Sequence, residues 1–389
     1  MSFGHACVDV YQGAVAALVP YFVAEREYTY AAASGIVLAA SLLSSVVQPL
    51  FGALTDKWAM PWLLPVSTLV GGAGVALSGV FGSYALTLAV VAVSGVGVAA
   101  YHPEAARVAR VASRGSHTAM GWFSLGGNLG FATAPLLVSA VVATGGLGAS
   151  PLLVVPAVAG AALCAAALRG IATPAAATAP GAGKATGGDD WASFLRLTGA
   201  IVCRSIVFVG LSAFISLYVR ERVGGGEVSG TAALFVLYIG GAIGTVAGGR
   251  LATRYSRVIV VRWSYALTVL AVAGVVLVPG PLLYLFVALT SAGLYVPFSL
   301  HITLGQDYLP RRVGTASGVT LGLTVSVGGI ASPLIGALAD HTSLRTALAP
   351  LIALPAVGWL LLRPLREPEI PGTLGAAPAV TTAPAPDRT

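Results

Sequence analysis

The stretch "GALTDKWAMPW", residues 52–62, places two charged residues in a short break between long apolar segments. A glycine in this position lets two helices approach closely, and Asp56 and Lys57 stand where a turn between two spans would begin. The pentapeptide "GALTD" at 52–56 has a counterpart in "GRLAT" at 249–253, 197 residues later, in which Thr253 replaces the acidic residue. The two loops indicate that the chain contains a duplicated unit.

Two further pairs of matching stretches have nearly the same offset. "YHPEA" around His102 matches "LHITL" around His301, 199 residues later, and "ATAPLL" around Pro135 matches "IASPLI" around Pro333, 198 residues later. Parallel repeats of this kind are typical of transporters whose substrate site lies between the two halves, near the middle of the membrane.

The composition excludes most soluble proteins. Of the 389 residues 57% are hydrophobic and only 9% are charged, with a mean hydropathy of +0.88, whereas a soluble domain carries about 25% charged residues. Despite a net charge of +7, nucleic-acid binding is therefore not expected, and neither is a soluble enzyme. The three cysteines lie in apolar runs without paired spacing, which predicts buried thiols rather than a disulfide framework or a metal site.

Each membrane-spanning helix needs about 20 mostly apolar residues. Division of the chain at its charged and turn-rich points predicts an all-α membrane protein of twelve transmembrane helices in two pseudo-symmetric six-helix halves, with spans near 5–24, 33–54, 62–80, 84–104, 118–143, 150–168, 193–219, 231–252, 260–278, 282–304, 314–338 and 345–363. The predicted domains are an N-terminal bundle (1–168), a cytoplasmic linker (169–192), a C-terminal bundle (193–366) and a disordered cytoplasmic tail (367–389).

The distribution of positive charge predicts the orientation. Of the 21 Lys and Arg residues, all except Arg204 lie in loops or near helix ends. With the N-terminus inside, sixteen of these twenty fall on the cytoplasmic side and four on the other. Because Lys and Arg collect on cytoplasmic loops, both termini are expected to be cytoplasmic.

The run "GVAAYHPEAARVARVAS", residues 97–113, ends the fourth apolar segment with ionisable side chains. His102 and Glu104 lie near its cytoplasmic end, and Arg107 and Arg110 follow on one helical face. One interpretation is positive-inside charge at a helix end. The other is a cytoplasmic gate in which His102 or Glu104 also carries protons, and in which Asp56 or Glu104 pairs with the arginines.

Asp9 and Arg204 are charged residues inside predicted spans. A carboxylate there costs about 2.5–3.5 kcal/mol on insertion scales, so Asp9 is the strongest single functional candidate, with snorkelling to the interface as the alternative. Arg204 lies at a similar depth, 195 residues later. It could pair with Asp9 or bind a phosphonate or carboxylate through forked hydrogen bonds, or it could snorkel to the rim.

Three further polar residues interrupt apolar helices. His301 could carry a proton or donate a hydrogen bond to a substrate, or simply pack inside the bundle. Asn128 and Gln48 could line a pathway or hold helices together.

These motifs together resemble a known family. "GALTDKWAMPW" resembles the signature loop of the major facilitator superfamily, in which the acidic residue latches one access state. "GH…D…Q" at Gly4, His5, Asp9 and Gln12, "QPLFGALTDKWAMPW", "HPEAARVARVAS", "GGNLG" at 126–130 and "GALADHTS" at 336–343 resemble the fosmidomycin-resistance branch of that superfamily. Ser124 and Val8 depart from the branch, which tends to carry Gln and Asn there.

The resemblance implies a proton-coupled secondary transporter that exports a small polar or anionic compound, such as a fosmidomycin-like antibiotic, from a bacterial cell. The alternatives are a proton-coupled importer or exchanger of a sugar or organic acid, and a non-transporting membrane sensor. Enzyme activity, a cofactor and a resident metal are not expected. The expected partners are the substrate, protons and membrane lipid, and the chain is expected to be a monomer of the cytoplasmic membrane.

The expected roles divide the candidate residues into three groups. Proton coupling is assigned to Asp9, His102 and Glu104; substrate binding to Arg204, Asn128, His301, Gln48 and Gln12; and the cytoplasmic latch to Asp56, Lys57, Arg107, Arg110 and Arg250.

Overall fold

The computed structural model describes residues 1–112, 117–170 and 188–368. Within the helices, the side chains at 45–46, 56–57, 110–111, 117–121, 313–314, 317–318 and 321–326 lie outside the description. Three predicted latch residues, Asp56, Lys57 and Arg110, fall in this group.

Helices make up both halves of the described chain. The N-terminal half consists of α1 (Ser2–Arg26), α2 (Tyr30–Lys57), α3 (Leu63–Leu77), α4 (Tyr84–Ala112), α5 (His117–Gly145), the 3₁₀ segment η1 (Gly146–Val154) and α6 (Val155–Gly170). The C-terminal half consists of α7 (Trp191–Val223), α8 (Gly226–Ala252), α9 (Arg257–Leu277), α10 (Leu283–Tyr295), α11 (Phe298–Tyr308), α12 (Val313–His341), α13 (Leu344–Leu348), the 3₁₀ segment η2 (Ala349–Ile352) and α14 (Ala353–Leu362).

These elements form six rods in each half, because three of the rods contain a break. The breaks are η1, the step between α10 and α11, and η2, and they contain Pro151, Pro297 and Pro350 respectively. Proline removes a backbone donor and clashes with the preceding turn, which favours an interruption there. Continuous helices nevertheless accommodate Pro20, Pro49, Pro103, Pro135 and Pro333. Among the described residues, nine helical segments are long and apolar enough to cross a membrane. The predicted twelve-helix architecture is confirmed.

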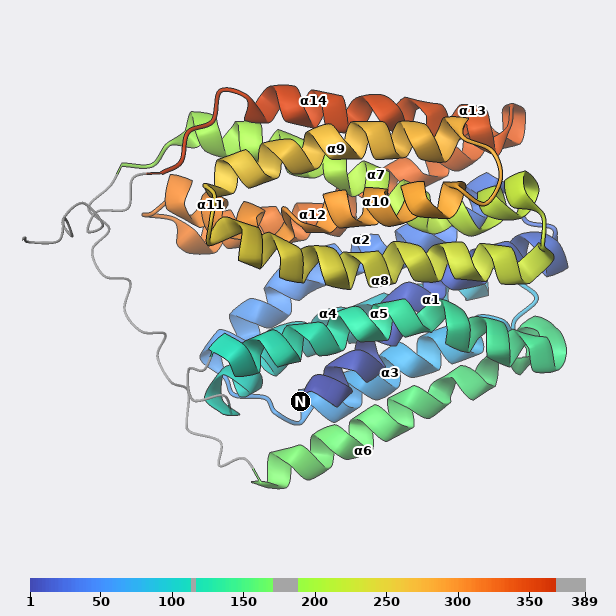
Figure 1. Ribbon diagram of the computed structural model, residues 1–389. Coiled ribbons are helices and arrows are strands. Elements are labelled where there is room, and N and C mark those ends of the chain that lie inside the picture. Colours follow the sequence, from blue (N-terminus) through green and yellow to red (C-terminus); the bar gives the residue numbers. More distant parts are fainter. Residues whose placement is uncertain (113–116, 171–187, 369–389) are drawn as a thin grey trace, which may run out of the picture.

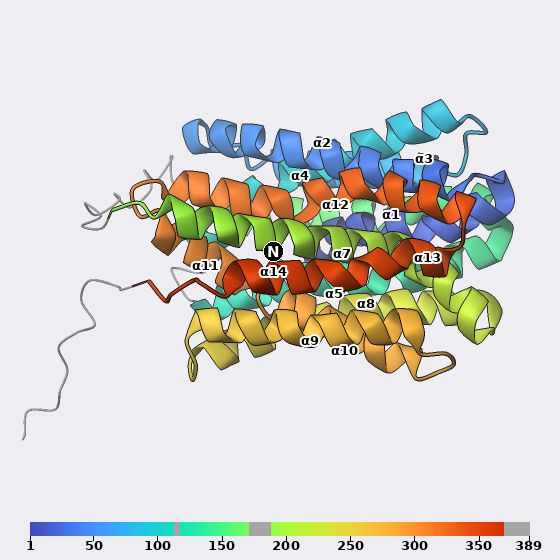
Figure 2. The ribbon, with the colours of Figure 1, turned by 90° about the horizontal axis from the view of Figure 1, so that it is seen from above.

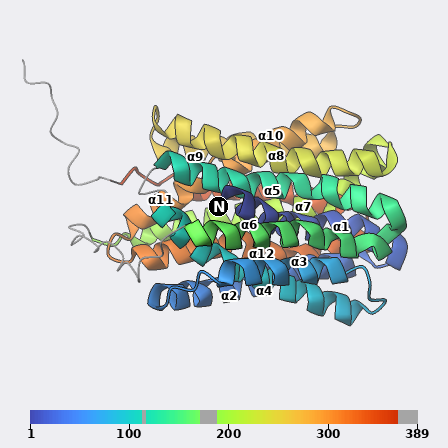
Figure 3. The ribbon, with the colours of Figure 1, turned by 90° about the horizontal axis from the view of Figure 1, so that it is seen from below.

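The rods run side by side, with α6 and α14 at opposite margins of the molecule (Figure 1). The two halves meet along α2 with α12 and along α5 with α8, and both pairs are visible when the bundle is seen from above and below (Figures 2 and 3). The central helices α1 and α7 bury most of their side chains, whereas α6 and α9 expose large apolar residues to the surroundings. This arrangement places polar groups of α1 and α7 deep in the molecule.

The halves are joined at the end of the bundle where α2 begins, called here the Tyr30 end. Both carboxylate oxygens of Asp340, on α12, accept hydrogen bonds from the first turn of α2: from Tyr30 N at 2.7 Å and from Ala31 N at 3.0 Å. A Cβ atom at Gly336 would lie 2.6 Å from the carbonyl oxygen of Tyr30, so the two backbones touch there. A carboxylate at a helix N-terminus accepts hydrogen bonds from the free N–H groups there and interacts favourably with the positive end of the helix dipole.

The predicted domain boundaries differ slightly from the structure. Asp190, assigned to the linker, caps α7 by accepting a hydrogen bond from Ser193 N at 3.0 Å, and hydrogen bonds from Ser193 lower the pKa of that carboxyl. Glu367, assigned to the disordered tail, accepts hydrogen bonds from Arg257 Nε at 2.6 Å and Val258 N at 3.1 Å. Through these hydrogen bonds, the carboxylates of both residues contact the C-terminal half. The rest of the linker and tail, 171–187 and 369–389, lies outside the described residues.

Candidate functional site

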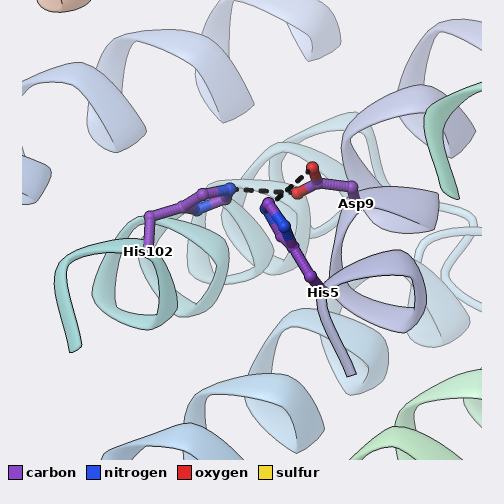
Figure 4. A group of neighbouring side chains, drawn as sticks. All are labelled: His5, Asp9 and His102. Atoms are coloured by element: carbon purple, nitrogen blue, oxygen red, sulfur yellow. Dashed lines mark ion pairs between the residues drawn. The ribbon is translucent and has the colours of Figure 1, made fainter. Parts of the chain in front are cut away.

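Three ionisable side chains converge near the start of α1 and the end of α4 (Figure 4). The carboxylate of Asp9 lies between two imidazoles: Oδ1 is 3.0 Å from His102 Nε2 and Oδ2 is 3.3 Å from His5 Nε2. His5 and Asp9 are one turn apart on α1, and His102 reaches them from α4. His5 and Asp9 are buried, whereas the His102 side chain remains 23% exposed. These residues are called the His–Asp cluster below.

The backbone determines which ring nitrogen carries hydrogen in each imidazole. His5 Nδ1 lies 2.8 Å from Phe123 O, and His102 Nδ1 lies 2.8 Å from Val98 O. A carbonyl oxygen only accepts, so both Nδ1 atoms must be the donors. In a neutral imidazole this leaves a lone pair on Nε2, which would then face the lone pairs of the Asp9 carboxylate. Each contact with Asp9 therefore becomes attractive only when a proton occupies it.

Helix α5 closes one side of the His–Asp cluster. The His5 ring stacks on Phe123 with centroids 4.2 Å apart. A Cβ atom at Gly127 would lie 2.4 Å from Asp9 Oδ2 and 2.7 Å from His5 Cε1. Only a glycine leaves room for the carboxylate at this place, and this explains one residue of the "GGNLG" motif.

The His–Asp cluster also has the composition of a metal site. Its three ligand atoms lie within 4.8 Å of one another, and backbone acceptors on the second nitrogens are common around metal-bound histidines. With bonds of about 2.0–2.2 Å, two ligand atoms of a tetrahedral zinc ion lie about 3.4 Å apart. The 3.0 Å separation of His102 Nε2 from Asp9 Oδ1 is shorter and has the length of a hydrogen bond. The 3.3 Å separation of His5 Nε2 from Asp9 Oδ2 is close to the metal spacing, so the three residues could hold either protons or a metal ion.

The neighbouring carboxylate of Glu104 has a different partner. It is fully buried and forms a two-pronged ion pair with Arg107, one turn further along α4, with one contact of 2.9 Å from Arg107 Nε to Glu104 Oε2. The sequence assigned Glu104 to proton coupling and Arg107 to the latch, with Asp56 or Glu104 as the partner of the arginines; in the structure Glu104 pairs with Arg107. Arg250, another predicted latch residue, is exposed at the end of α8.

Beside the His–Asp cluster lies a cavity of about 300 Å³ between the two halves. Helices α1, α2, α4 and α5 line it on one side, and α7 and α8 on the other. Val98 and Pro103, which flank His102 on α4, belong to its wall. Gln12 and Gln48, which were assigned to substrate binding from the sequence, also line the cavity. None of the described side chains that line it carries a charge.

The other predicted substrate residues lie elsewhere. Arg204 is only 2% exposed, donates from Nε to Leu294 O, and lies 5.4 Å from the ring centroids of Tyr295 and Phe298. The small pocket beside it leaves no room for a water molecule. His301 is buried against Tyr265, with ring centroids 5.8 Å apart.

Asn128 is half-buried on α5, and the cavity wall does not include it among the described residues. The suggested pairing of Asp9 with Arg204 is absent from the described structure, because Asp9 is paired with histidines. His5 was not among the residues predicted from the sequence to take part in proton coupling, although it contacts Asp9 in the structure. Its spacing of four residues from Asp9 places both side chains on one helical face, and this was the available signal.

A model of the Major Facilitator Superfamily matches residues 1–333. The chain belongs to the major facilitator superfamily. Its curated relatives include the "Fosmidomycin resistance protein" of Escherichia coli (strain K12), which is 29% identical over 377 residues, or 93% of this chain and 91% of that protein. The "Uncharacterized MFS-type transporter YfnC" of Bacillus subtilis (strain 168) is also 29% identical, over 92% of this chain and 89% of that protein. The superfamily and the resemblance to its fosmidomycin-resistance branch are thus confirmed.

Solved structures agree on the fold. A bacterial homologue of the human lysosomal transporter Spinster, in an inward-facing and occupied conformation, covers 93% of this chain and 95% of its own, with a TM-score of 0.76 and 14% identity. A point mutant of the nucleoside transporter NupG covers 93% of this chain and 97% of its own, with a TM-score of 0.73 and 14% identity. The chain is a multi-span membrane transporter of this superfamily rather than an enzyme.

Proposed function

We propose that this transporter exports a small organic compound in exchange for protons, and that the His–Asp cluster binds those protons. The observation that carries the proposal is the pair of Nδ1 hydrogen bonds, which point both Nε2 lone pairs at the Asp9 carboxylate. With two protons bound, the cluster makes both of its contacts and has a net charge of +1. With none bound, it has a charge of −1 and its contacts repel.

The position of the cluster supports a link between protons and cargo. His102 stands on α4 between two residues that line the cavity, and Asp9 precedes Gln12, which also lines it, by about one turn of α1. Loss of the protons would weaken the contact between α1 and α4 at the cavity wall. Protonation would thereby change the wall that the cargo meets, and alternating access requires a ligand that favours one conformation over the other.

The direction of transport rests on the name of a relative and on the charge pattern. A resistance protein in Escherichia coli is 29% identical, and export from the cell is one way in which a transporter confers resistance. The positive-inside pattern places the Tyr30 end outside. Because Asp340 closes that end, the structure would then be a state with the outer side shut.

The test uses the full-length protein in liposomes under an imposed pH gradient, with fosmidomycin and chloramphenicol as two probes. We expect at least one probe to evoke proton movement, and we expect Asp9→Asn to reduce that movement by about 100-fold, as for loss of an essential proton carrier. Proton movement that survives in the Asp9→Asn variant would show that the cluster is not the coupling site. Silence of the folded wild-type protein with both probes would refute proton-coupled export of either compound.

A matched control separates proton binding from the loss of any buried carboxylate. Glu104→Gln also neutralises a buried acid, but that acid is paired with Arg107 outside the cluster. We expect it to retain proton movement while Asp9→Asn loses it. A chelator such as EDTA should leave the wild-type signal unchanged, whereas inhibition by the chelator would indicate that a metal ion occupies the cluster.

A further inference from the structure

We infer that the central cavity takes an uncharged compound that carries an aromatic ring and hydrogen-bonding groups, rather than an anion of the fosmidomycin type. The inference concerns the cargo and rests on the proposal that this cavity is the transport site. It opposes the expectation, drawn from the sequence, that Arg204 would bind an anionic substrate.

First, the described wall of the cavity contains no positively charged side chain that could pair with an anion. A carboxylate or phosphonate moved into an apolar cavity needs a cation, because the loss of hydration of a buried ion costs several kcal/mol. Among the described residues, Arg204 is a buried cation of a spanning helix, but it does not line the cavity: its Nε donates to Leu294 O and its guanidinium packs against Tyr295 and Phe298. His102 and Asp9 of the His–Asp cluster lie within three residues of the lining residues Pro103 and Gln12. The cluster has a charge of −1 when its protons leave, and in that state it would repel an anion.

The second argument is the aromatic part of the wall. Phe131 of α5 and Tyr238 of α8 meet edge to face with centroids 4.9 Å apart, and Phe208 of α7 lies 6.3 Å from Tyr238. All three line the cavity, and they come from both halves. Rings in this arrangement offer faces and edges to another aromatic group, and each such pair contributes about 0.5–1.5 kcal/mol beyond the area that it buries.

The third argument is the supply of hydrogen bonds. Several polar groups of the wall already have partners within the protein: Tyr11 Oη donates to Leu153 O at 2.9 Å, and Ser94 Oγ donates to Gly71 O at 2.7 Å. In the described part of the chain, the amides of Gln12 and Gln48 make no hydrogen bond with other residues. Each amide offers both a donor and an acceptor, and this pair of groups fits the hydroxyl, carbonyl or amide groups of a neutral molecule.

The experiment compares probes that differ mainly in charge. Binding of chloramphenicol, of its anionic hemisuccinate and of the neutral methyl ester of that hemisuccinate is measured with the purified full-length protein in detergent, without a pH gradient. We expect the two neutral compounds to bind, and the hemisuccinate to bind at least about tenfold more weakly, since a buried unpaired charge costs more than about 1.4 kcal/mol. Equal or tighter binding of the hemisuccinate, or no binding of either neutral compound to folded protein, overturns the inference.

A variant reverses the predicted preference. Gln48→Lys places a cation in the wall of the cavity and should strengthen binding of the hemisuccinate relative to its methyl ester. The control Thr253→Lys adds the same charge on the exposed turn after α8, outside the cavity, and should leave the ratio unchanged. An unchanged ratio in Gln48→Lys would also overturn the inference. Because binding is measured without proton flow, these results are independent of the Asp9→Asn test.

Discussion

At the scale of single residues, the cluster depends on the absence of a side chain as much as on the presence of three. Gly127 lies against both Asp9 and His5, and any Cβ there would overlap the carboxylate. The "GGNLG" motif places two further glycines against α1: Cβ atoms at Gly126 and Gly130 would lie 2.3 Å and 2.1 Å from backbone oxygens of α1. At these three glycines, helix α5 therefore lies directly against α1, with no side chain of α5 in between.

We predict that Gly127→Ala moves Asp9 out of its position and lowers probe-evoked proton movement in liposomes by about tenfold or more. The added methyl group also overpacks the interface, with an expected cost of about 1–3 kcal/mol in unfolding free energy. The control is Gly249→Ala, because a Cβ at that helical glycine meets nothing within 4 Å. If Gly127→Ala transports and unfolds like the Gly249→Ala variant, the described packing of α5 on the cluster is wrong.

The sequence predicted individual members of the site better than their partners. Asp9 was conspicuous because a carboxylate inside an apolar span is costly, and His102 because it ends an apolar segment together with Glu104. That they meet depends on the contact between α1 and α4, which no periodicity within either helix encodes. Arg204 was equally conspicuous and was given a substrate role, but its Nε donates to Leu294 O and it is not among the described residues that line the cavity. Depth in the membrane can be read from a sequence, whereas the direction in which a side chain points needs its neighbours.

At the scale of elements, most predicted spans match helices, but their ends and internal breaks do not. The fourth span, predicted to end at residue 104, continues as α4 to Ala112. The extended part of α4 contains Arg107, which forms an ion pair with Glu104 one turn earlier and thereby stabilises the helix beyond the apolar run. The tenth span is divided at Pro297 into α10 and α11. An apolar run sets the length of a span, while capping and pairing of polar groups set where the helix ends.

Helix α2 provides the second prediction, because its first turn is capped by a residue of the other half. Asp340→Ala removes the acceptor for Tyr30 N and Ala31 N. A lost cap costs about 0.5–2 kcal/mol, which changes an equilibrium by a factor of about 2–30. We expect the Tyr30 end to open more often by that factor.

The opening is measured in a Val37→Cys background, since Val37 lines the cavity on α2. The readout is the rate at which a membrane-impermeant maleimide, added to intact cells, labels the introduced thiol, after the half-buried native Cys7 has been replaced by Ser. Asp307→Ala is the control, since Asp307 pairs with Arg257 inside the C-terminal half. A labelling rate in Asp340→Ala equal to that of the control would mean that Asp340 does not hold the halves together.

At the scale of the whole molecule, the two halves share one arrangement of helices but differ in the charge of a buried residue. The first half has an acid, Asp9, where the second half has a base, Arg204. Asp9 and Arg204 occupy central helices, and His102 and His301 occupy the corresponding fourth and tenth spans. In the first half the acid contacts its histidine directly, while in the second half Arg204 packs on aromatic rings instead. The offsets of 197–199 residues revealed the repeat, but sequence similarity alone did not reveal that only one half would place its ionisable residues beside the cavity.

The orientation of the whole bundle gives the last prediction. With both termini in the cytoplasm, green fluorescent protein fused after Thr389 should fluoresce, and alkaline phosphatase fused there should be inactive. A chain truncated at Gly280, between α9 and α10, should give an active phosphatase, since that loop is predicted to lie outside. The opposite pattern at both positions would invert the molecule and place Asp340 on the cytoplasmic side.

The uncharged wall of the cavity has an electrical consequence. In the proposed exchange of an uncharged cargo for protons, each turnover would carry net charge across the bilayer, and the exchange would be electrogenic. A potential of about 100 mV acts on each such charge with about 2.3 kcal/mol. An energised cell would then drive export through its membrane voltage alone, even where the acidity inside and outside is the same.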